Sequence, residues 1–178
     1  KATATDSLPE RPSLTLVLGG ARSGKSAYAE GLVTSRPAPW TYVATAQAFD
    51  DKMTERIALH KARRGDGWTT LDALLDVKEI LEALPDGRPM LLDCLTLWLS
   101  NQMLAGRDVE AESGKLAACL SRPRGPWVVV ANEVGLGIVP DNALARRFRD
   151  AAGRLNQQVA SVADRVVFMV AGLPMQVK

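Results

Sequence analysis

The residues best suited to chemistry lie in one glycine-rich stretch, GGARSGKS. It fits the pattern GxxxxGK[ST], follows an apolar run at 14–18 and precedes a helical pattern, as phosphate-binding loops do. Glycines allow the tight wrap, and main-chain N–H groups at the start of a helix attract anionic oxygens. Lys25 would act on the β- and γ-phosphates, and the Ser26 hydroxyl would be a ligand of Mg²⁺. The predicted nucleotide-binding residues here are Gly19, Gly20, Ala21, Arg22, Ser23, Gly24, Lys25 and Ser26.

A magnesium site beside such a loop also needs a carboxylate. Asp93 closes the apolar run 89–92 and is the predicted second ligand, although Asp is also a favoured helix N-cap. Glu133 follows a second apolar run, and parallel strands bring their carboxyl ends to the same edge as the loop. Glu133 is therefore either a base or second metal contact, or an ordinary loop acid.

The only histidine in the chain lies in a charged helical pattern. Asp50 or Asp51 would cap this helix, and four residues spaced by four, three and four share one face: Met53, Ile57, His60 and Arg64. A single histidine on such a face is either a packed residue or a catalyst, and both interpretations stay open. Arg22, Arg56 and Arg64 are either clamps for phosphates or solvated surface charges.

The elements that must position these residues alternate along the chain. Five apolar runs predict buried strands at 14–18, 41–45, 90–93, 127–131 and 165–171, with a brief edge strand at 175–177. Helical patterns lie at 25–34, 51–64, 72–84 and 141–162. This alternation predicts an α/β fold, a three-layer sandwich around a mostly parallel sheet. We expect one catalytic domain at 14–178, preceded by a flexible N-terminal arm at 1–13.

Composition limits the functional classes. The 178 residues are 47% apolar and 24% charged, with a net charge of +2, which gives no support for nucleic-acid binding. Cys94 and Cys119 are expected to be reduced thiols. The first residues do not look like a signal peptide, and no apolar run approaches the ~20 residues of a membrane span. A cytoplasmic protein is expected.

Four segments resemble one enzyme family: GGARSGKS, YVATAQAFDDKMTERIALHKARRGDGWTT, LLDCLTLWLSN and ANEVGLGIVPDNALARRFRDAAGRLNQQVA. They are similar to the bifunctional adenosylcobinamide kinase / adenosylcobinamide-phosphate guanylyltransferase, over about residues 14–178. The resemblance implies a P-loop NTPase fold of the RecA-like type, a homotrimer and ATP and GTP as substrates. It also implies that His60 becomes covalently guanylylated, and that GTP contacts Ala44, Thr45, Ala46, Lys61, Ala62, Arg63, Arg64, Asp72 and Asp93.

Two of these positions depart from the family pattern. Asp72 falls where such enzymes usually carry Glu, and Asp93 where some relatives do, so the charge is kept on a shorter side chain. The implied reactions are phosphorylation of the adenosylcobinamide hydroxyl and transfer of GMP from GTP, through His60, to give adenosylcobinamide-GDP. Two other classes remain open: a phosphate-loop kinase of small molecules in which His60 is structural, and a GTP-binding module without catalysis.

Overall fold

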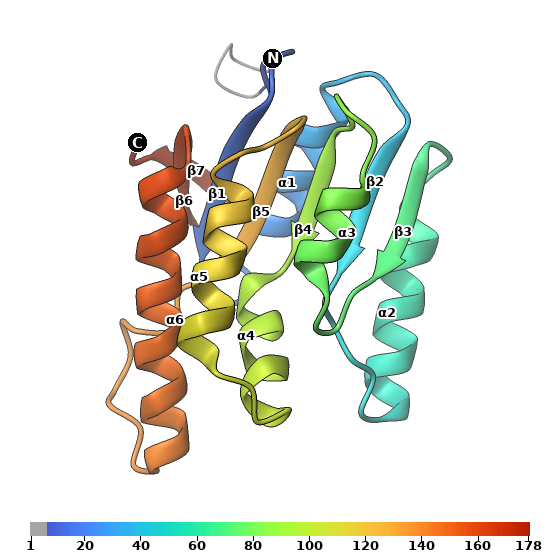
Figure 1. Ribbon diagram of the computed structural model, residues 1–178. Coiled ribbons are helices and arrows are strands. Elements are labelled where there is room, and N and C mark those ends of the chain that lie inside the picture. Colours follow the sequence, from blue (N-terminus) through green and yellow to red (C-terminus); the bar gives the residue numbers. More distant parts are fainter. Residues whose placement is uncertain (1–6) are drawn as a thin grey trace.

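A twisted sheet with helices on both faces forms the frame of the molecule in the computed structural model, which describes residues 7–178 (Figure 1). Within these residues the seven strands lie in the order β3-β2-β4-β5-β1-β6-β7, and all pair in parallel except β7, which runs antiparallel to β6. This confirms the predicted α/β class with a mostly parallel sheet. The strands are β1 Ser13–Gly19, β2 Trp40–Ala44, β3 Trp68–Asp72, β4 Met90–Asp93, β5 Pro126–Asn132, β6 Arg165–Val170 and β7 Leu173–Gln176.

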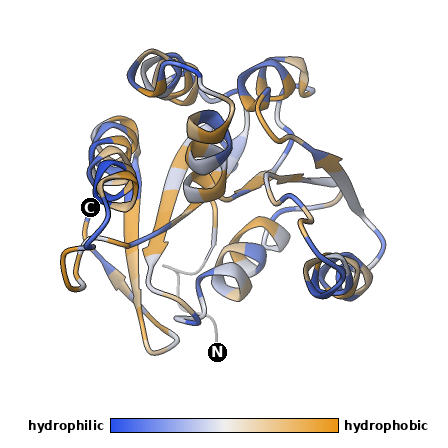
Figure 2. Cartoon of the chain, turned by 90° about the horizontal axis from the view of Figure 1, so that it is seen from below, coloured by the Kyte–Doolittle hydropathy of each residue, from blue (hydrophilic) through white to orange (hydrophobic). Residues whose placement is uncertain are grey.

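The helices divide between the two faces. Figures 1 and 2 show α1 and α2 on one face and α3 to α6 on the other, which completes the three layers. Their bounds are α1 Lys25–Thr34, α2 Asp51–Arg63, α3 Val77–Ala83, α4 Leu95–Leu104, α5 Val109–Leu120 and α6 Ala143–Val162.

Two apolar clusters hold the layers together. The larger cluster packs the side chains of α3 to α6 against one face of the sheet, with Trp98, Trp127 and Leu155 among its buried members. The smaller cluster packs α1 against the other face through Ala29 and Leu32. The central strands are therefore covered on both sides, which explains why their sequences are continuous apolar runs instead of alternating ones.

The strand register brings polar residues together at the carboxyl edge of the sheet. Ala44 of β2 lies opposite Asp72 of β3 and also opposite Asp93 of β4. The phosphate loop begins at the same edge, directly after β1, since Gly19 pairs with Asn132 at the end of β5. Functional residues that are distant in sequence thus converge because parallel strands end on the same side.

The segment before β1 is only partly described. Residues 1–6 of the predicted arm lie outside the described residues. In the remainder, Leu8 is buried in the cluster beneath α1, and its main-chain N–H donates to the Ser35 hydroxyl at 3.0 Å. Glu10 forms an ion pair with Arg36 at 3.2 Å.

The structure corrects the sequence prediction at five elements. The predicted helix at 72–84 is wrong at its start, because Asp72 ends the edge strand β3 and the helix α3 begins only at Val77. Strand β3 and helices α4 and α5 were not predicted. The final strand was placed slightly too late: β7 spans Leu173–Gln176 and forms a hairpin with β6, through Ala171 and Gly172, which both have positive φ.

Candidate active site

The phosphate loop joins β1 to α1 in the geometry its sequence predicts. Gly24 is the N-cap of α1 with φ of +88°, a left-handed conformation that glycine adopts without strain. The buried Lys25 ammonium lies over the loop and donates to the Gly20 carbonyl at 2.9 Å. The Ser23 hydroxyl is buried without a hydrogen-bond partner among the described residues, so a polar donor is held inside the loop. These features suit an anionic phosphate.

Asp93 does not cap a helix. The N-cap of α4 is Cys94, and the Asp93 carboxylate instead accepts a hydrogen bond from the Tyr42 hydroxyl, with 2.5 Å between the oxygens. The helix-cap alternative for Asp93 is therefore wrong. Burial raises the pKa of the neighbouring Cys94 thiol to about 11, with Asp93 raising it further and Lys25 lowering it. Asp93 and the phosphate-loop lysine therefore both act electrostatically on the same buried residue.

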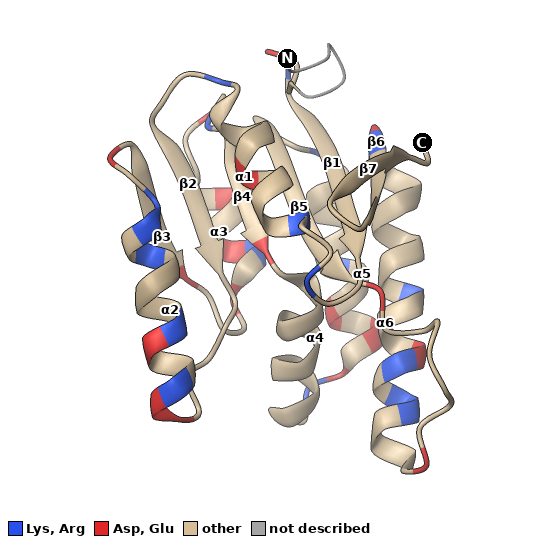
Figure 3. Ribbon diagram, turned by 180° about the vertical axis from the view of Figure 1, so that it is seen from behind, with Lys and Arg blue, Asp and Glu red and all other residues tan. Residues whose placement is uncertain are grey.

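Helix α2 presents the face that the sequence spacing predicts. Between residues 51 and 64, the half-buried side chains are Met53, Ile57, His60 and Arg64, and the others are exposed. The Asp50 side chain caps the helix by accepting the Met53 N–H at 2.7 Å. Figure 3 shows acidic and basic residues mixed in the first turns of α2, and basic residues alone in its last turn, which also holds His60. The end of the helix is therefore its anion-attracting part.

Arg64 is not a solvated surface charge. Its guanidinium carbon lies 3.6 Å from the centroid of the Tyr42 ring, and its Nη2 donates to the Thr70 hydroxyl at 3.4 Å. Its Nε and Nη1 are buried and have no hydrogen-bond partner among the described residues. Buried donors without acceptors are costly, so this guanidinium is suited to receive an anion.

The carboxyl of Glu30, in α1, is affected electrostatically by both His60 and Asp93. Burial raises the pKa of its carboxyl, Arg64, Arg63 and His60 lower that pKa, and Asp93 raises it. Glu30 is therefore influenced by a group of charges from α2 and β4, and we call Glu30, His60, Arg64 and Asp93 the charged cluster. Lys25 of the phosphate loop and Asp93 of this cluster both act electrostatically on Cys94.

The remaining predicted contact residues differ in how far they are buried. Thr45 is fully buried, and its hydroxyl accepts from the Cys94 N–H and donates to the Cys94 carbonyl, so its side chain supports the turn after β4. Asp72 is exposed and forms an ion pair with Lys61 at 3.4 Å. Of the others, Ala44 is buried and Ala46 half-buried, and the exposed ones are Arg22, Arg56, Ala62 and Arg63.

The oxygen donors at the loop fit a magnesium ion. Within residues 7–178, no three His, Cys, Asp or Glu side chains are grouped so that they could hold a metal by themselves. Ser26 and Asp93 instead offer a hydroxyl and a carboxylate near the phosphate loop. Mg²⁺ commonly binds through one or two protein oxygens together with substrate phosphates and several waters, so this sparse set is the appropriate one.

Glu133 lies next to the loop but is engaged locally. Its main-chain N–H donates to the Gly19 carbonyl at 3.0 Å, and its Oε1 accepts the Gly135 N–H at 2.6 Å. The bond to Gly19 places Glu133 beside the phosphate loop. The bond from Gly135 shows that its carboxylate stabilises the turn after β5. Its possible role as a base remains a prediction.

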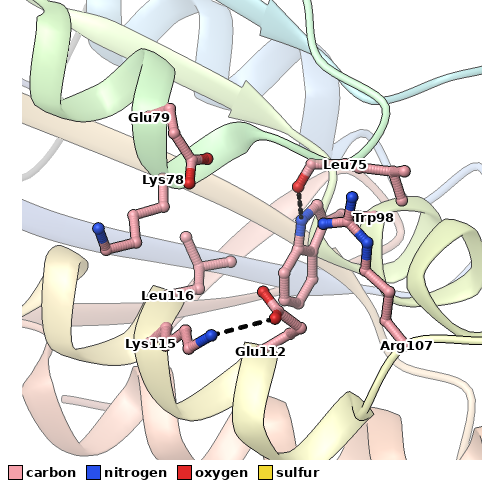
Figure 4. Close-up of a pocket in the computed structure, with 8 residues that line it drawn as sticks. All are labelled: Leu75, Lys78, Glu79, Trp98, Arg107, Glu112, Lys115 and Leu116. Atoms are coloured by element: carbon pink, nitrogen blue, oxygen red, sulfur yellow. Dashed lines mark hydrogen bonds and ion pairs between the residues drawn. The ribbon is translucent and has the colours of Figure 1, made fainter.

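A pocket of about 280 Å³ lies on the opposite face of the sheet, between α3, α4 and α5 (Figure 4). Its indole donor, Trp98 Nε1, is bonded to the Leu75 carbonyl at 3.1 Å. Each of its cations has an acidic partner: the ion pairs are Lys78–Glu82, Arg107–Asp76 and Lys115–Glu112. The pocket is thus balanced in charge and separate from the cluster around His60.

Sequence analysis missed three residues of this site: Tyr42, Thr70 and Glu30. Tyr42 lies in an apolar run that predicts a buried strand, and nothing in the sequence indicates a role for its hydroxyl. Thr70 belongs to β3, which was itself missed. Glu30 looks like an ordinary helix-surface acid, but it lies four residues after Ser26 and so one turn along the same face of α1, which is the one signal that could have identified it.

The sequence is similar to known proteins over nearly its whole length. A family model described as cobinamide kinase / cobinamide phosphate guanyltransferase matches residues 15–177. A bifunctional adenosylcobalamin biosynthesis protein of Pseudomonas aeruginosa is 46% identical over 166 residues, which cover 92% of this chain and 96% of the relative. The corresponding protein of Salmonella typhimurium is 40% identical over 182 residues, covering 93% and 99%.

Solved structures with a similar fold are distant in sequence. An ATPase from the type III secretion system of pathogenic bacteria has a TM-score of 0.57 at 13% identity, and the match covers 92% of this chain but 56% of the ATPase. The ATPase EscN of enteropathogenic E. coli has a TM-score of 0.53 at 13% identity, with 90% and 43% covered. This likeness shows the fold of P-loop NTPases.

Proposed function

Because this chain belongs to the cobinamide kinase / cobinamide phosphate guanyltransferase family, we propose that one phosphate loop serves both reactions and that His60 carries the GMP. The protein is a bifunctional enzyme of adenosylcobalamin biosynthesis, with kinase and guanylyltransferase activities. The observation that supports a single site is the pair of contacts that joins Asp93, through Tyr42, to Arg64. Arg64, His60 and Asp93 also all act electrostatically on Glu30, and Lys25 and Asp93 both act on Cys94.

In the kinase step, a hydroxyl of adenosylcobinamide attacks the γ-phosphorus of the nucleoside triphosphate, here ATP. The bond to the bridging oxygen breaks, the diphosphate leaves and the hydroxyl proton passes to solvent. Lys25 and the loop N–H groups stabilise the negative charge that develops on the phosphate oxygens. Ser26 and Asp93 would hold Mg²⁺, which neutralises phosphate charge when it is bound.

In the transfer step, an imidazole nitrogen of His60 forms a bond to the α-phosphorus of GTP. The bond from that phosphorus to the bridging oxygen breaks, pyrophosphate leaves and the ring proton is released. A phosphate oxygen of adenosylcobinamide phosphate then attacks the same phosphorus, the P–N bond breaks and the imidazole regains a proton. Arg64 is placed to bind a phosphate in this step, because two of its buried donors lack a partner among the described residues.

A covalent assay separates this proposal from a kinase without nucleotidyl transfer. We expect the protein, denatured after incubation with GTP labelled at the α-phosphate, to retain the label and to have released pyrophosphate. The same incubation with GTP labelled at the γ-phosphate should leave no label on the protein. A protein that retained neither label would be a plain kinase or a GTP-binding module, and His60 would then be structural.

The Asp93→Asn variant is expected to lower turnover far more than nucleotide affinity. The change removes the negative charge from the proposed magnesium ligand but keeps an acceptor for the Tyr42 hydroxyl. We expect kcat of both activities to fall by roughly 10- to 100-fold, while the dissociation constant of GTP changes by less than about threefold. Steady-state kinetics and equilibrium dialysis measure the two quantities.

Asp86→Asn is the matched control for this prediction. Asp86 makes an exposed ion pair with Arg124 before β4 begins, at the opposite end of that strand from Asp93. It should leave both activities unchanged. An equal loss of binding and turnover in Asp93→Asn would mean that Asp93 only supports the fold.

We further propose that the chain works in the cytoplasm as a homotrimer, as its family resemblance implies. None of the helices in the described part of the chain is long and apolar enough to cross a membrane. Apolar side chains are exposed between β5 and α6 and at the start of α6, among them Leu136 (82%), Ile138 (97%) and Leu144 (57%), and such surface often marks an interface. Sedimentation equilibrium should give three times the chain mass of 19.2 kDa, and a monomer would contradict this proposal.

A further inference from the structure

One buried tyrosine joins the two charged residues on which the transfer step depends. Tyr42 lies in β2 with only 6% of its surface exposed. Its hydroxyl donates to Asp93 Oδ2 at 2.5 Å, and its ring carries the Arg64 guanidinium at 3.6 Å. We propose that Tyr42 is a positioning residue that fixes the anion-binding Arg64 relative to the carboxylate of Asp93. This inference rests on the proposed function.

The ring of Tyr42 is itself held in place. It packs edge-on against Trp68 of β3, with 5.9 Å between ring centroids, and Trp68 packs against Trp40 at 5.4 Å. The two tryptophans lie opposite each other in the paired strands β2 and β3. The aromatic cluster therefore gives Arg64 a rigid platform.

The contact with the Tyr42 ring matters because Arg64 lies at the end of a helix that is only weakly packed against the rest of the protein. Residue 64 directly follows α2, a helix that buries none of its residues fully. Besides its contact with the Tyr42 ring, the Arg64 side chain donates a long hydrogen bond to the Thr70 hydroxyl at 3.4 Å. A cation over an aromatic ring contributes about 0.5–2 kcal/mol, depending on its desolvation. Tyr42 thus supplies the contact that keeps Nε and Nη1 of Arg64, which have no hydrogen-bond partner within residues 7–178, ready for a phosphate oxygen.

A purely structural role for Tyr42 makes a different prediction from a positioning role. If Tyr42 acts through Arg64, removing the ring should cost little once Arg64 is already gone, because the two effects share one interaction. If Tyr42 only fills the core, its loss should weaken GTP binding by the same factor whether or not Arg64 is present. A double-mutant cycle separates these possibilities.

The cycle combines Tyr42→Leu with Arg64→Met, and the readout is the dissociation constant of GTP. All binding is measured in the His60→Ala background, where GTP is not consumed by guanylylation. We expect Tyr42→Leu alone to weaken GTP binding about tenfold, and to weaken it by less than about twofold when Arg64→Met is present. If Tyr42→Leu raises the dissociation constant of GTP by the same factor with and without Arg64→Met, the inference is wrong.

Tyr42→Phe tests the hydroxyl separately and is conservative enough to fold. It keeps the platform, so GTP affinity should stay within about twofold, while kcat of guanylyl transfer should fall about tenfold through a poorly oriented Asp93. The matched control is Tyr28→Phe, since Tyr28 is the only other tyrosine and its hydroxyl accepts from Arg165 at 2.9 Å, at the start of β6. Unchanged kcat in Tyr42→Phe, or an equal loss in Tyr28→Phe, would contradict the role of the hydroxyl.

These outcomes are distinguishable from a failure of the proposed function. The coupling between Tyr42 and Arg64 is read from GTP binding alone, in a protein that lacks His60. If GMP is carried by another residue, the labelling assays fail while the coupling persists. If Tyr42 is only a core residue, the labelling of wild-type protein succeeds while the coupling is absent.

Discussion

The Lys25→Ala variant is expected to lose both activities, by at least about 10²–10³-fold in kcat/KM for each. The Lys25 ammonium is buried in the phosphate loop and donates to the Gly20 carbonyl, so it sits where the phosphates of a nucleotide would bind. In both steps negative charge develops on phosphate oxygens, and removal of a fixed positive charge raises both barriers. Rates of phosphorylation and of pyrophosphate release from GTP, measured on the same preparation, give the two losses.

Two variants serve as controls for Lys25→Ala. Lys115→Ala removes an exposed lysine of α5 that pairs with Glu112, and it should leave both rates unchanged. Lys25→Arg keeps the charge but replaces a compact ammonium with a larger planar group in a buried position, so it should not restore activity. A Lys25→Ala protein that guanylylates at the wild-type rate would require a second nucleotide site and would disprove the single-loop account.

The His60→Ala variant is expected to separate the two reactions. Guanylyl transfer should fall by roughly 10⁴-fold or more, because no other histidine exists in the chain to replace the nucleophile. The kinase step should keep most of its rate, since transfer of the γ-phosphate uses the loop, the metal ligands and substrate positioning. The preserved kinase rate is an internal control for folding.

Lys61 is the nearest competing nucleophile. Its amine is adjacent to His60 in sequence, and a phosphoramidate on lysine would share the acid lability of one on histidine. In the structure the Lys61 ammonium pairs with Asp72 at 3.4 Å, and an ion-paired ammonium has no lone pair to attack phosphorus. A Lys61→Ala variant should therefore still become guanylylated. Loss of labelling in that variant together with retention in His60→Ala would assign the reaction to Lys61.

The sequence was sufficient for those parts of the fold and site that follow from local patterns. The phosphate loop was predicted from GGARSGKS with its flanking strand and helix. The inward face of α2 followed from its spacing, because a helix that packs on one side only must repeat its apolar positions every three or four residues.

The missed elements depend on tertiary contacts. Helix α4 is apolar on nearly every side and shows no helical period, and its polar Asn101 is satisfied only by the distant carbonyls of Thr45 and Leu74. Strand β3 is a half-exposed edge strand, so it lacks the apolar run of the central strands. The contact between Tyr42 and Arg64 joins a buried strand to a helix end, and a residue spacing cannot predict it.

The most direct test of the central claim is peptide mapping of the wild-type protein after incubation with GTP. We predict one GMP on the peptide that contains His60, with fragmentation placing it on the imidazole. The modification should be lost in mild acid and retained in base, as expected of a phosphoramidate. GMP on Lys61 or on any other residue, or a protein that carries no GMP under conditions in which it transfers GMP to adenosylcobinamide phosphate, would contradict the account.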